Sequence, residues 1–418
     1  MGSPIHSPWL QRFAVFAVVC TLILIGMGGL VTSKEAGMAV YDWPTSFGYN
    51  MFLLPLDRWL GIGGVFEEHS HRLIAMLVAA LTGILTAWLW IRETTGPARA
   101  IALGAIFLTM VLMGVRAQPM LIAMAVFAAA LAAVSIFKII KDRRALRWWG
   151  VLASSMVIVQ AVIGGLRVLK GNDQIGIFHG VLAQIFLVVL ASLTLFHSRW
   201  WKQARDAGNT KNLVPRVVRS HFFFATLLIF LQLILGATMR HQHTGLPVWD
   251  FPKAHGQWWP ATDEASLAKY NSERRALQIQ LNENQKNADT VLMAPKSAIQ
   301  PIRASEIHLH MFHRVMAVLI LGLVLGTVIL AHRKLGARHF LSRTSLLWLG
   351  LILAQATLGA LTVLQYKPAD IATLHVLFGA LSLGTGVLGT VISRTKKLPS
   401  LIPQTELSEA AMNKARAV

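Results

Sequence analysis

Long apolar runs alternate with short polar segments along almost the whole chain. Because a transmembrane helix needs about 20 consecutive, mostly apolar residues, each run predicts one membrane span. The runs cover residues 11–31, 70–91, 99–116, 119–138, 149–168, 177–197, 221–240, 310–331, 344–364 and 372–393. The pattern therefore predicts an all-α membrane protein with about ten spans.

The polar signals between these runs occur twice in the same order. The segment Gly28–Gly48, GGLVTSKEAGMAVYDWPTSFG, matches Gly236–Gly256, GATMRHQHTGLPVWDFPKAHG, at a constant offset of 208 residues. Each is followed by a His-Arg pair and then by a histidine that opens a later span, and these are His71-Arg72 with His179, and His313-Arg314 with His375. The repeat predicts two pseudo-symmetric four-helix transmembrane bundles, an eight-helix core whose symmetry axis runs along the membrane normal.

The remaining segments fit around these two bundles. The predicted parts are a first bundle at 11–197 with two inserted helices at 99–138, a cytoplasmic linker at 198–220, a second bundle at 221–393 with a long outer loop at 241–309, and a cytoplasmic tail at 394–418. Within the long outer loop, the polar stretch Ala265–Asn287 predicts a short exposed helix, to which we assign no chemistry.

The charge distribution favours a membrane protein over a nucleic-acid-binding one. Of the 418 residues 55% are hydrophobic and only 14% are charged, while the net charge is +20. The basic residues gather on the side of the predicted membrane that faces the cytoplasm, in Lys138–Arg147, Trp200–Arg219, His332–Arg343 and Arg394–Lys397. Both termini are therefore predicted to be cytoplasmic, and no soluble domain offers a basic face to nucleic acid.

Several features have structural interpretations. Cys20, the single cysteine, lies within an apolar run, which excludes an intrachain disulfide and a multi-cysteine metal site. Residues 12–31 follow little positive charge and precede no small-residue cleavage site, so we interpret them as a retained span rather than a signal peptide. The glycine pairs at 28–29 and 164–165 indicate close helix packing, and Trp43 suits the aromatic belt of the outer interface.

Four histidines within the spans are the main candidates for chemistry. They form two repeat-matched pairs, His71 with His179 and His313 with His375, near the predicted outer face. Two histidines from different helices at one depth are what a six-coordinate haem iron requires. The alternative is a core histidine bonded to a main-chain carbonyl, and the matched positions of all four disfavour it.

Four arginines near the outer ends of the spans are candidates for contacts with haem propionates. Arg72 and Arg314 directly follow their histidines, whereas Arg167 and Arg240 are weaker candidates of the same kind. A guanidinium forms paired hydrogen bonds to a carboxylate. The alternative is an interfacial arginine that extends toward the lipid headgroups.

The two halves differ at one position that matters for catalysis. Glu68 precedes His71 by three residues, so both share one helix face, whereas the second half has His310 at the matching position. An acid beside a haem in a dry pocket can protonate or orient a substrate. The first half is therefore predicted to carry out a reaction and the second to deliver electrons.

At these residues the sequence resembles the haem A synthase family, the membrane enzymes that complete haem A for terminal oxidases. The resemblance rests on Gly28-Gly29-Leu30 with Gly37 and Asp42-Trp43-Pro44, on Glu68-x-x-His71-Arg72, on Gln160-x3-Gly164-Gly165-Leu166, on His179, on His313-Arg314 and on His375. It covers nearly all of residues 12–393. Two features depart from the family: the first outer loop lacks the cysteine pair of many bacterial members, and the helices at 99–138 are additional.

The resemblance implies an oxidoreductase with two non-equivalent haem sites. It implies haem b as cofactor on His313 and His375, and haem O on His71 and His179. The C8 methyl of haem O is then oxidised to the formyl of haem A by successive hydroxylations. Glu68 matches the essential acidic position of the family.

The expected setting is the bacterial inner membrane, with the haem sites toward the outer face. Expected partners are haem O, membrane lipid, an electron donor that the sequence does not identify, haem O synthase, terminal oxidase assembly factors and a second copy of the chain. Two other functions compete: a bis-histidine cytochrome b that only relays electrons, for example from quinol, and a transporter. Glu68 argues against the first, and the outer position of the histidines argues against the second.

Overall fold

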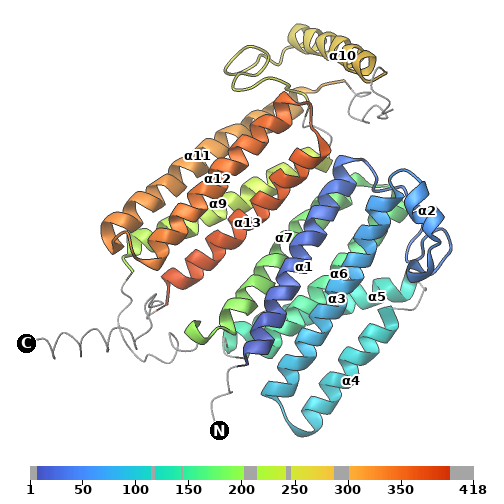
Figure 1. Cartoon of the computed structure of the whole chain (residues 1–418), viewed down its shortest axis with the longest axis vertical. Helices are drawn as coiled ribbons and strands as arrows, with labels where there is room; N and C mark the ends of the chain where they lie inside the picture. Colours follow the sequence, from blue (N-terminus) through green and yellow to red (C-terminus); the bar gives the residue numbers. More distant parts are fainter. Residues whose placement is uncertain are drawn as a thin grey trace, which may run out of the picture.

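The computed structural model describes residues 7–113, 118–142, 145–201, 214–241, 246–286 and 301–395. Within these ranges all the regular elements are helices (Figure 1). They are α1 (Pro8–Ser33), the 3-10 helix η1 (Met51–Leu53), α2 (Leu56–Gly61), α3 (Val65–Glu93), α4 (Gly96–Met113), α5 (Gln118–Lys141), α6 (Leu146–Lys170), α7 (Asp173–Phe196), α9 (Arg216–His241), α10 (Glu264–Lys286), α11 (Ala304–Leu335), α12 (Phe340–Leu364) and α13 (Ala369–Ser393). The predicted all-α fold is confirmed.

Nine of the described helices are long and apolar enough to cross a membrane: α1, α3, α5, α6, α7, α9, α11, α12 and α13. The predicted span at 99–116 corresponds to α4, whose described apolar part, Gly96–Thr109, is shorter than a span. Residues 114–117, at the end of that predicted span, lie outside the described residues. The same holds for 202–213 of the linker, 242–245 and 287–300 of the long outer loop, and 396–418 of the tail.

The long helices pack as two neighbouring groups of four (Figure 1). In the first group α1, α3, α6 and α7 form a ring of contacts, and in the second α9, α11, α12 and α13 do the same. The groups meet where α1 and α7 lie against α13, and α7 against α9. The inserted helix α5 packs along α6, while α4 contacts α3. These inserted helices therefore cover the outside of the first group, away from the second.

Several helices begin or end at residues that cap them, either with a side chain that accepts a hydrogen bond from a free main-chain N–H or with a glycine in the left-handed conformation. Gly171, in the left-handed conformation (φ 58°), ends α6. The Asn172 side chain then accepts a hydrogen bond from Gln174 N at 2.8 Å and begins α7. Similarly, His339 Nδ1 accepts from Leu341 N at 3.1 Å at the start of α12. Such caps supply partners for the first free N–H groups of a helix, so they determine where the spans begin.

The polar helix α10 docks on the second outer loop. The Tyr270 ring is buried and stacks on His255, with centroids 3.7 Å apart and planes within 7°. His255 Nε2 lies 2.8 Å from the carbonyl oxygen of Pro247, and Asn271 Oδ1 accepts from Ile302 N at 2.7 Å. Burial lowers the pKa of His255, although the Pro247 carbonyl and the Asp250 charge act in the opposite sense. The predicted exposed helix therefore exists and is held by one aromatic face.

Arg240 joins the two groups of helices near their outer ends. From α9 its guanidinium donates to the Gly29 carbonyl and, at 2.6 Å, to Ser33 Oγ, both on α1. It also donates to the Ala372 carbonyl of α13 at 3.4 Å. A Cβ at Gly29 would lie 2.9 Å from Thr373 Cγ2, so the helices can approach this closely only with glycine there. One side chain thus bridges both groups where α1 and α13 lie in close contact.

The core of the second group contains a tryptophan that two glycines accommodate. Trp348 is fully buried, stacks on Phe222 with centroids 5.5 Å apart, and donates from Nε1 to the Ser382 carbonyl at 2.8 Å. A Cβ at Gly386 would lie 2.6 Å from Trp348, and one at Gly389 would lie 2.5 Å from Phe222. The two rings therefore occupy space that α13 leaves free.

The substitution Trp348→Ala is expected to destabilise the protein by about 3–5 kcal/mol, since it opens a large cavity between α9, α12 and α13. Denaturation in detergent, followed by circular dichroism, measures this change. Leu347→Ala on the same helix is the matched control, because Leu347 is 62% exposed and its truncation leaves no buried cavity. Equal destabilisation by both substitutions would contradict the assignment of Trp348 to the core.

Candidate functional site

The first histidine pair lies across the centre of the first group of helices. His71 belongs to α3 and His179 to α7, which sit on opposite sides of the ring of four helices. Their ring centroids are 6.5 Å apart and the ring planes are 69° apart. An ion bonded to both imidazoles at about 2 Å would separate the centroids by roughly 6 Å. The predicted pair is therefore brought together with room for one metal ion.

Each of the four histidine rings lies against a glycine of the neighbouring helix. If these glycines carried a Cβ, its distance to the histidine Cε1 would be 3.1 Å for Gly28 and His71, 3.0 Å for Gly164 and His179, 3.5 Å for Gly236 and His313, and 3.1 Å for Gly359 and His375. The distances at Gly28, Gly164 and Gly359 are shorter than ordinary contacts, so the absence of a side chain at these glycines determines how closely the ring can approach. The close packing predicted for Gly28 and Gly164 is thus packing against the candidate ligands.

The ring nitrogens of the histidines are oriented in a repeated way. His375 Nδ1 lies 3.1 Å from the carbonyl oxygen of Gln355. The Nδ1 atoms of His71 and His179 face the carbonyls of Leu24 and Gln160 without reaching hydrogen-bond geometry. Each of these carbonyls belongs to the residue four positions before the contacting glycine. A histidine that points Nδ1 at a carbonyl can direct Nε2 to a metal ion. The Nε2 atom of His375 lies 3.4 Å from Gln355 Nε2, a contact that a metal ion there would replace.

Glutamine side chains hold the main chain of one histidine in each pair. Gln160 Nε2 donates to the His179 carbonyl at 2.7 Å, and Gln232 Nε2 donates to the His313 carbonyl at 2.9 Å. His313 Nδ1 is buried and has no hydrogen-bond partner among the described residues. A buried imidazole normally finds a partner. The Nδ1 atoms of His71 and His179 are unpaired as well, so these three rings differ from core histidines whose hydrogen bonds are already satisfied.

The donor set fits haem rather than a bare metal ion. Among the residues that the structure describes, no group of three or more His, Cys, Asp or Glu side chains could hold a metal. Each candidate centre therefore has two protein ligands. A haem iron needs only two, because the porphyrin supplies the other four. The residues present thus fit the group that the sequence predicted.

The first outer loop is folded around a partly buried carboxylate. Asp42 accepts hydrogen bonds from Phe47 N at 2.7 Å, Gly48 N at 2.8 Å and Thr45 Oγ1 at 2.5 Å. Burial raises the pKa of Asp42, but these hydrogen bonds outweigh it and hold the pKa below its usual value. The stabilisation is present above the pKa of the unfolded chain and is lost as the pH falls through the lowered value.

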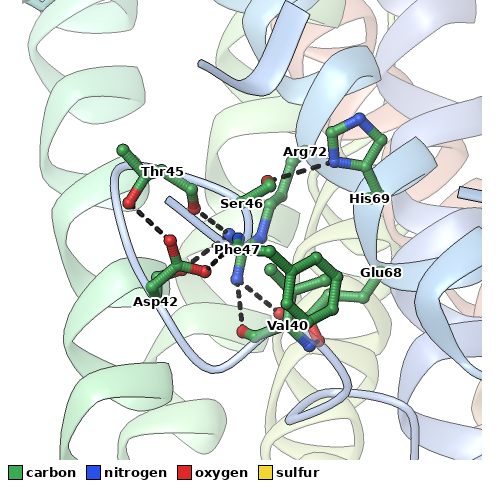
Figure 2. Close-up of polar contacts among 8 residues, drawn as sticks. All are labelled: Val40, Asp42, Thr45, Ser46, Phe47, Glu68, His69 and Arg72. Atoms are coloured by element: carbon green, nitrogen blue, oxygen red, sulfur yellow. Dashed lines mark hydrogen bonds and ion pairs between the residues drawn. The ribbon is translucent and has the colours of Figure 1, made fainter. Parts of the chain in front are cut away.

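Arg72 fastens this loop to helix α3 (Figure 2). Its Nη1 donates to the carbonyls of Asp42 and Thr45, both at 2.8 Å. Its Nη2 donates to the Val40 carbonyl at 2.8 Å and to Glu68 Oε1 at 2.6 Å. The other carboxylate oxygen of Glu68 accepts from Val40 N at 2.8 Å. The guanidinium and the carboxylate thus form one buried clamp on the loop.

The second half repeats the arginine but not the carboxylate. Arg314 donates to the carbonyls of Asp250 at 2.7 Å, Lys253 at 2.9 Å and Pro252 at 3.3 Å. At the position that matches Glu68 stands His310, which is buried and whose Nδ1 has no described partner. The predicted difference between the halves is therefore present in the structure.

The four predicted arginines occupy three kinds of position. Arg72 and Arg314 hold the outer loops, and Arg240 bridges the two groups of helices. Arg167, at the outer end of α6, packs against two glycines. A Cβ would lie 2.6 Å from its guanidinium if it were added to Gly37, and 3.1 Å if it were added to Gly176. The guanidinium groups of Arg72, Arg314 and Arg240 already donate to protein oxygens, so their contact with propionates stays a prediction, as does that of Arg167.

Two contacts of the first outer loop lie outside the sequence-based predictions. The Trp43 indole packs on Gly165, where a Cβ would lie 2.1 Å from the ring. His69 is buried with Nδ1 3.2 Å from Ser46 Oγ and its ring against Trp59. The repeat contains a signal for the contact of Trp43 with Gly165. In the second half a smaller ring, Phe251, matches Trp43, and a larger residue, Ala360, matches Gly165. Both contacts tie the loop to the helices beside His71 and His179.

The substitution Arg72→Gln is expected to loosen the first outer loop and to destabilise the fold by about 3–5 kcal/mol, because it leaves the buried Glu68 carboxylate without its cation. Hydrogen–deuterium exchange of the amides in residues 40–48 measures the loosening. Arg314→Gln is the matched control: Arg314 has no such carboxylate partner, so a smaller change is expected. Equal changes in the two loops would show that the carboxylate contributes nothing to the clamp.

Comparison with known proteins places this arrangement in a family. Residues 113–387, more than half of the chain, match the family model described as cytochrome oxidase assembly protein. A haem A synthase of Lysinibacillus sphaericus is 26% identical over 252 residues, which are 59% of this chain and 63% of the relative. One from Shouchella clausii is 22% identical over 60% of this chain and 65% of the relative.

The chain thus spans less than two thirds of these first two relatives. The match to a haem A synthase of Halalkalibacterium halodurans is longer, at 21% identity over 88% of this chain and 91% of the relative. The matched region of the family model includes both histidines of the second pair and one of the first. The chain therefore belongs to the cytochrome oxidase assembly protein family, the family of the haem A synthases.

Proposed function

We propose that this protein is a haem A synthase, which oxidises the C8 methyl group of haem O to a formyl group by successive hydroxylations. The family membership supports this proposal, and one observation carries it. Two matched histidine pairs sit in one scaffold, and only the pair His71 and His179 has a carboxylate, Glu68, one turn away. A protein that only relays electrons needs no such difference between its halves.

The two histidine pairs take different haems in this proposal. His71 and His179 bind the iron of the substrate, haem O, and the contacting glycines Gly28 and Gly164 hold both rings in place. His313 and His375 hold haem b as the resident cofactor. When bound, haem b would transfer electrons one at a time. The main-chain carbonyl of Gln355 fixes the orientation of the His375 ring.

Glu68 is the proposed catalytic residue. Its carboxylate is 3% exposed and is held by Val40 N and Arg72. A carboxylate with little contact to water can hold a proton for a substrate group or accept one from it. The same carboxylate also anchors the first outer loop. In this proposal the protonation state of Glu68 is therefore linked to how firmly the loop is held beside the first histidine pair.

The proposed setting follows from the basic segments and the family. The protein lies in the bacterial inner membrane with both termini in the cytoplasm and the histidine pairs toward the outer face. Its proposed partners are the electron donor, haem O synthase, terminal oxidase assembly factors and a second copy of the chain. In this proposal the propionates of the bound haems meet the arginines at the ends of the helices, and Arg167, which lies beside Gly37 of the first outer loop, is one of these.

Histidine substitutions separate the two haem roles. His313→Ala is expected to remove the stably bound haem b, whereas His71→Ala is expected to keep it and to lower haem O binding. Visible spectra of the purified variants, with extracted pigments identified by mass, measure both effects. Haem O or haem A beside haem b supports the synthase, while haem b alone in every preparation supports an electron relay. Identical spectra for the two variants would refute the division of roles.

The substitution Glu68→Gln is expected to leave both haems bound and to lower the yield of haem A at least 100-fold, within the range typical of lost acid–base catalysis. The amide oxygen can still accept from Val40 N, and Arg72 keeps its three main-chain acceptors, so the loop is expected to loosen less than in Arg72→Gln. Glu67→Gln is the matched control, since Glu67 pairs with Lys34 at 2.5 Å instead. Chromatography of the haems from cells that express each variant measures the yield, and unchanged haem A with Glu68→Gln would exclude the catalytic role.

A further inference from the structure

A small apolar cavity lies between the first outer loop and three helices of the first half. Its volume is about 50 Å³. The lining comes from the outer loop, α3, α5 and α6, and includes Trp43, Met51, Met76, Leu121, Met124 and Ala161. The lining side chains are apolar, and three are methionines, whose flexible thioethers adapt to irregular ligands. Such a lining suits a hydrocarbon chain and offers no partner to a polar group.

Only the main chain of two glycines separates this cavity from the first histidine pair. On one side of α6 the His179 ring lies against Gly164, where a Cβ would be 3.0 Å away. On the other side the Trp43 indole, which lines the cavity, lies against Gly165. Because neither residue has a side chain, the wall is thinnest here. Because the lining comes from both α3 and α6, the cavity lies at the contact between these two helices, beside the first histidine pair.

The second half differs from the first at positions that line this cavity. Ala360 stands where the first half has Gly165, and Phe251 stands where it has Trp43. The Phe251 ring lies under the Arg314 guanidinium, 5.5 Å from its centroid. Among the described helices, α12 packs along α11 and α13 only, whereas α6 is also covered by α5. The side chains and the covering helix that build the cavity in the first half are therefore not matched at the corresponding described positions of the second half.

We propose that this cavity receives the end of the isoprenoid tail of the substrate haem, with the inserted helix α5 as its outer wall. The inference rests on the proposed function. Haem O carries a farnesyl-derived tail that haem b lacks, so only the substrate half needs an apolar cavity beside its histidines. A volume of about 50 Å³ holds roughly four groups the size of a water molecule, which suits the branched end of the tail.

The test compares binding of two haems that differ in the tail. Full-length protein is purified from cells that make no haem O, and haem O or haem B is titrated while the Soret band is followed. Met124→Trp, which fills the cavity, is expected to weaken haem O binding at least tenfold and to leave haem B binding unchanged. Val126→Trp is the matched control, because Val126 on the same helix is 67% exposed and faces away from the cavity.

A second variant guards against misfolding of the first. Ala161→Leu adds volume to the cavity from α6 and is expected to weaken haem O binding selectively as well. Equal weakening of both haems, or no change for either, would overturn the tail site. The tail site would also be overturned if a lipid acyl chain copurified with the protein and haem O did not displace it. If the unsubstituted protein fails to bind haem O at all, the proposed function itself fails.

Discussion

The structure depends on the contact between an imidazole ring and a neighbouring helix that has no side chain at that point. Each of the four histidines meets a glycine in this way. The contact fixes the distance between adjacent helices and the orientation of the ring at once, so the protein itself holds the four rings in place. Such preorganisation suits a membrane interior, where an unsatisfied polar side chain is costly and has few other partners.

Much of this arrangement could be predicted from the sequence, because the apolar runs and the internal repeat are both visible in the order of the side chains. The spans, the pairing of His71 with His179, and the difference between Glu68 and His310 are of this kind. The clamp of Arg72 could not be predicted, because three of its four acceptors are main-chain carbonyls. Every residue has a main-chain carbonyl, so the sequence does not indicate which of them accept. The cavity behind Trp43 depends on the placement of α5, which has no counterpart in the repeat to compare.

The two halves share a scaffold and differ in the side chains placed on it. A loop held by an arginine, a turn closed on an aspartate and two ring–glycine contacts recur in both. What differs is Glu68 against His310 and a cavity closed by an added helix. The shared parts satisfy the polar groups of the outer loops, and this leaves individual positions free to diverge toward substrate or cofactor.

The Arg240 bridge also makes the second half depend on the first. The residue that matches Arg240 in the first half is Thr32, whose side chain donates to the Gly28 carbonyl of its own helix at 3.0 Å. Arg240 instead takes the Gly29 carbonyl and Ser33 Oγ of the first half as acceptors. A second half expressed alone would therefore leave this guanidinium without these two acceptors, whereas the first half would lose no acceptor of Thr32.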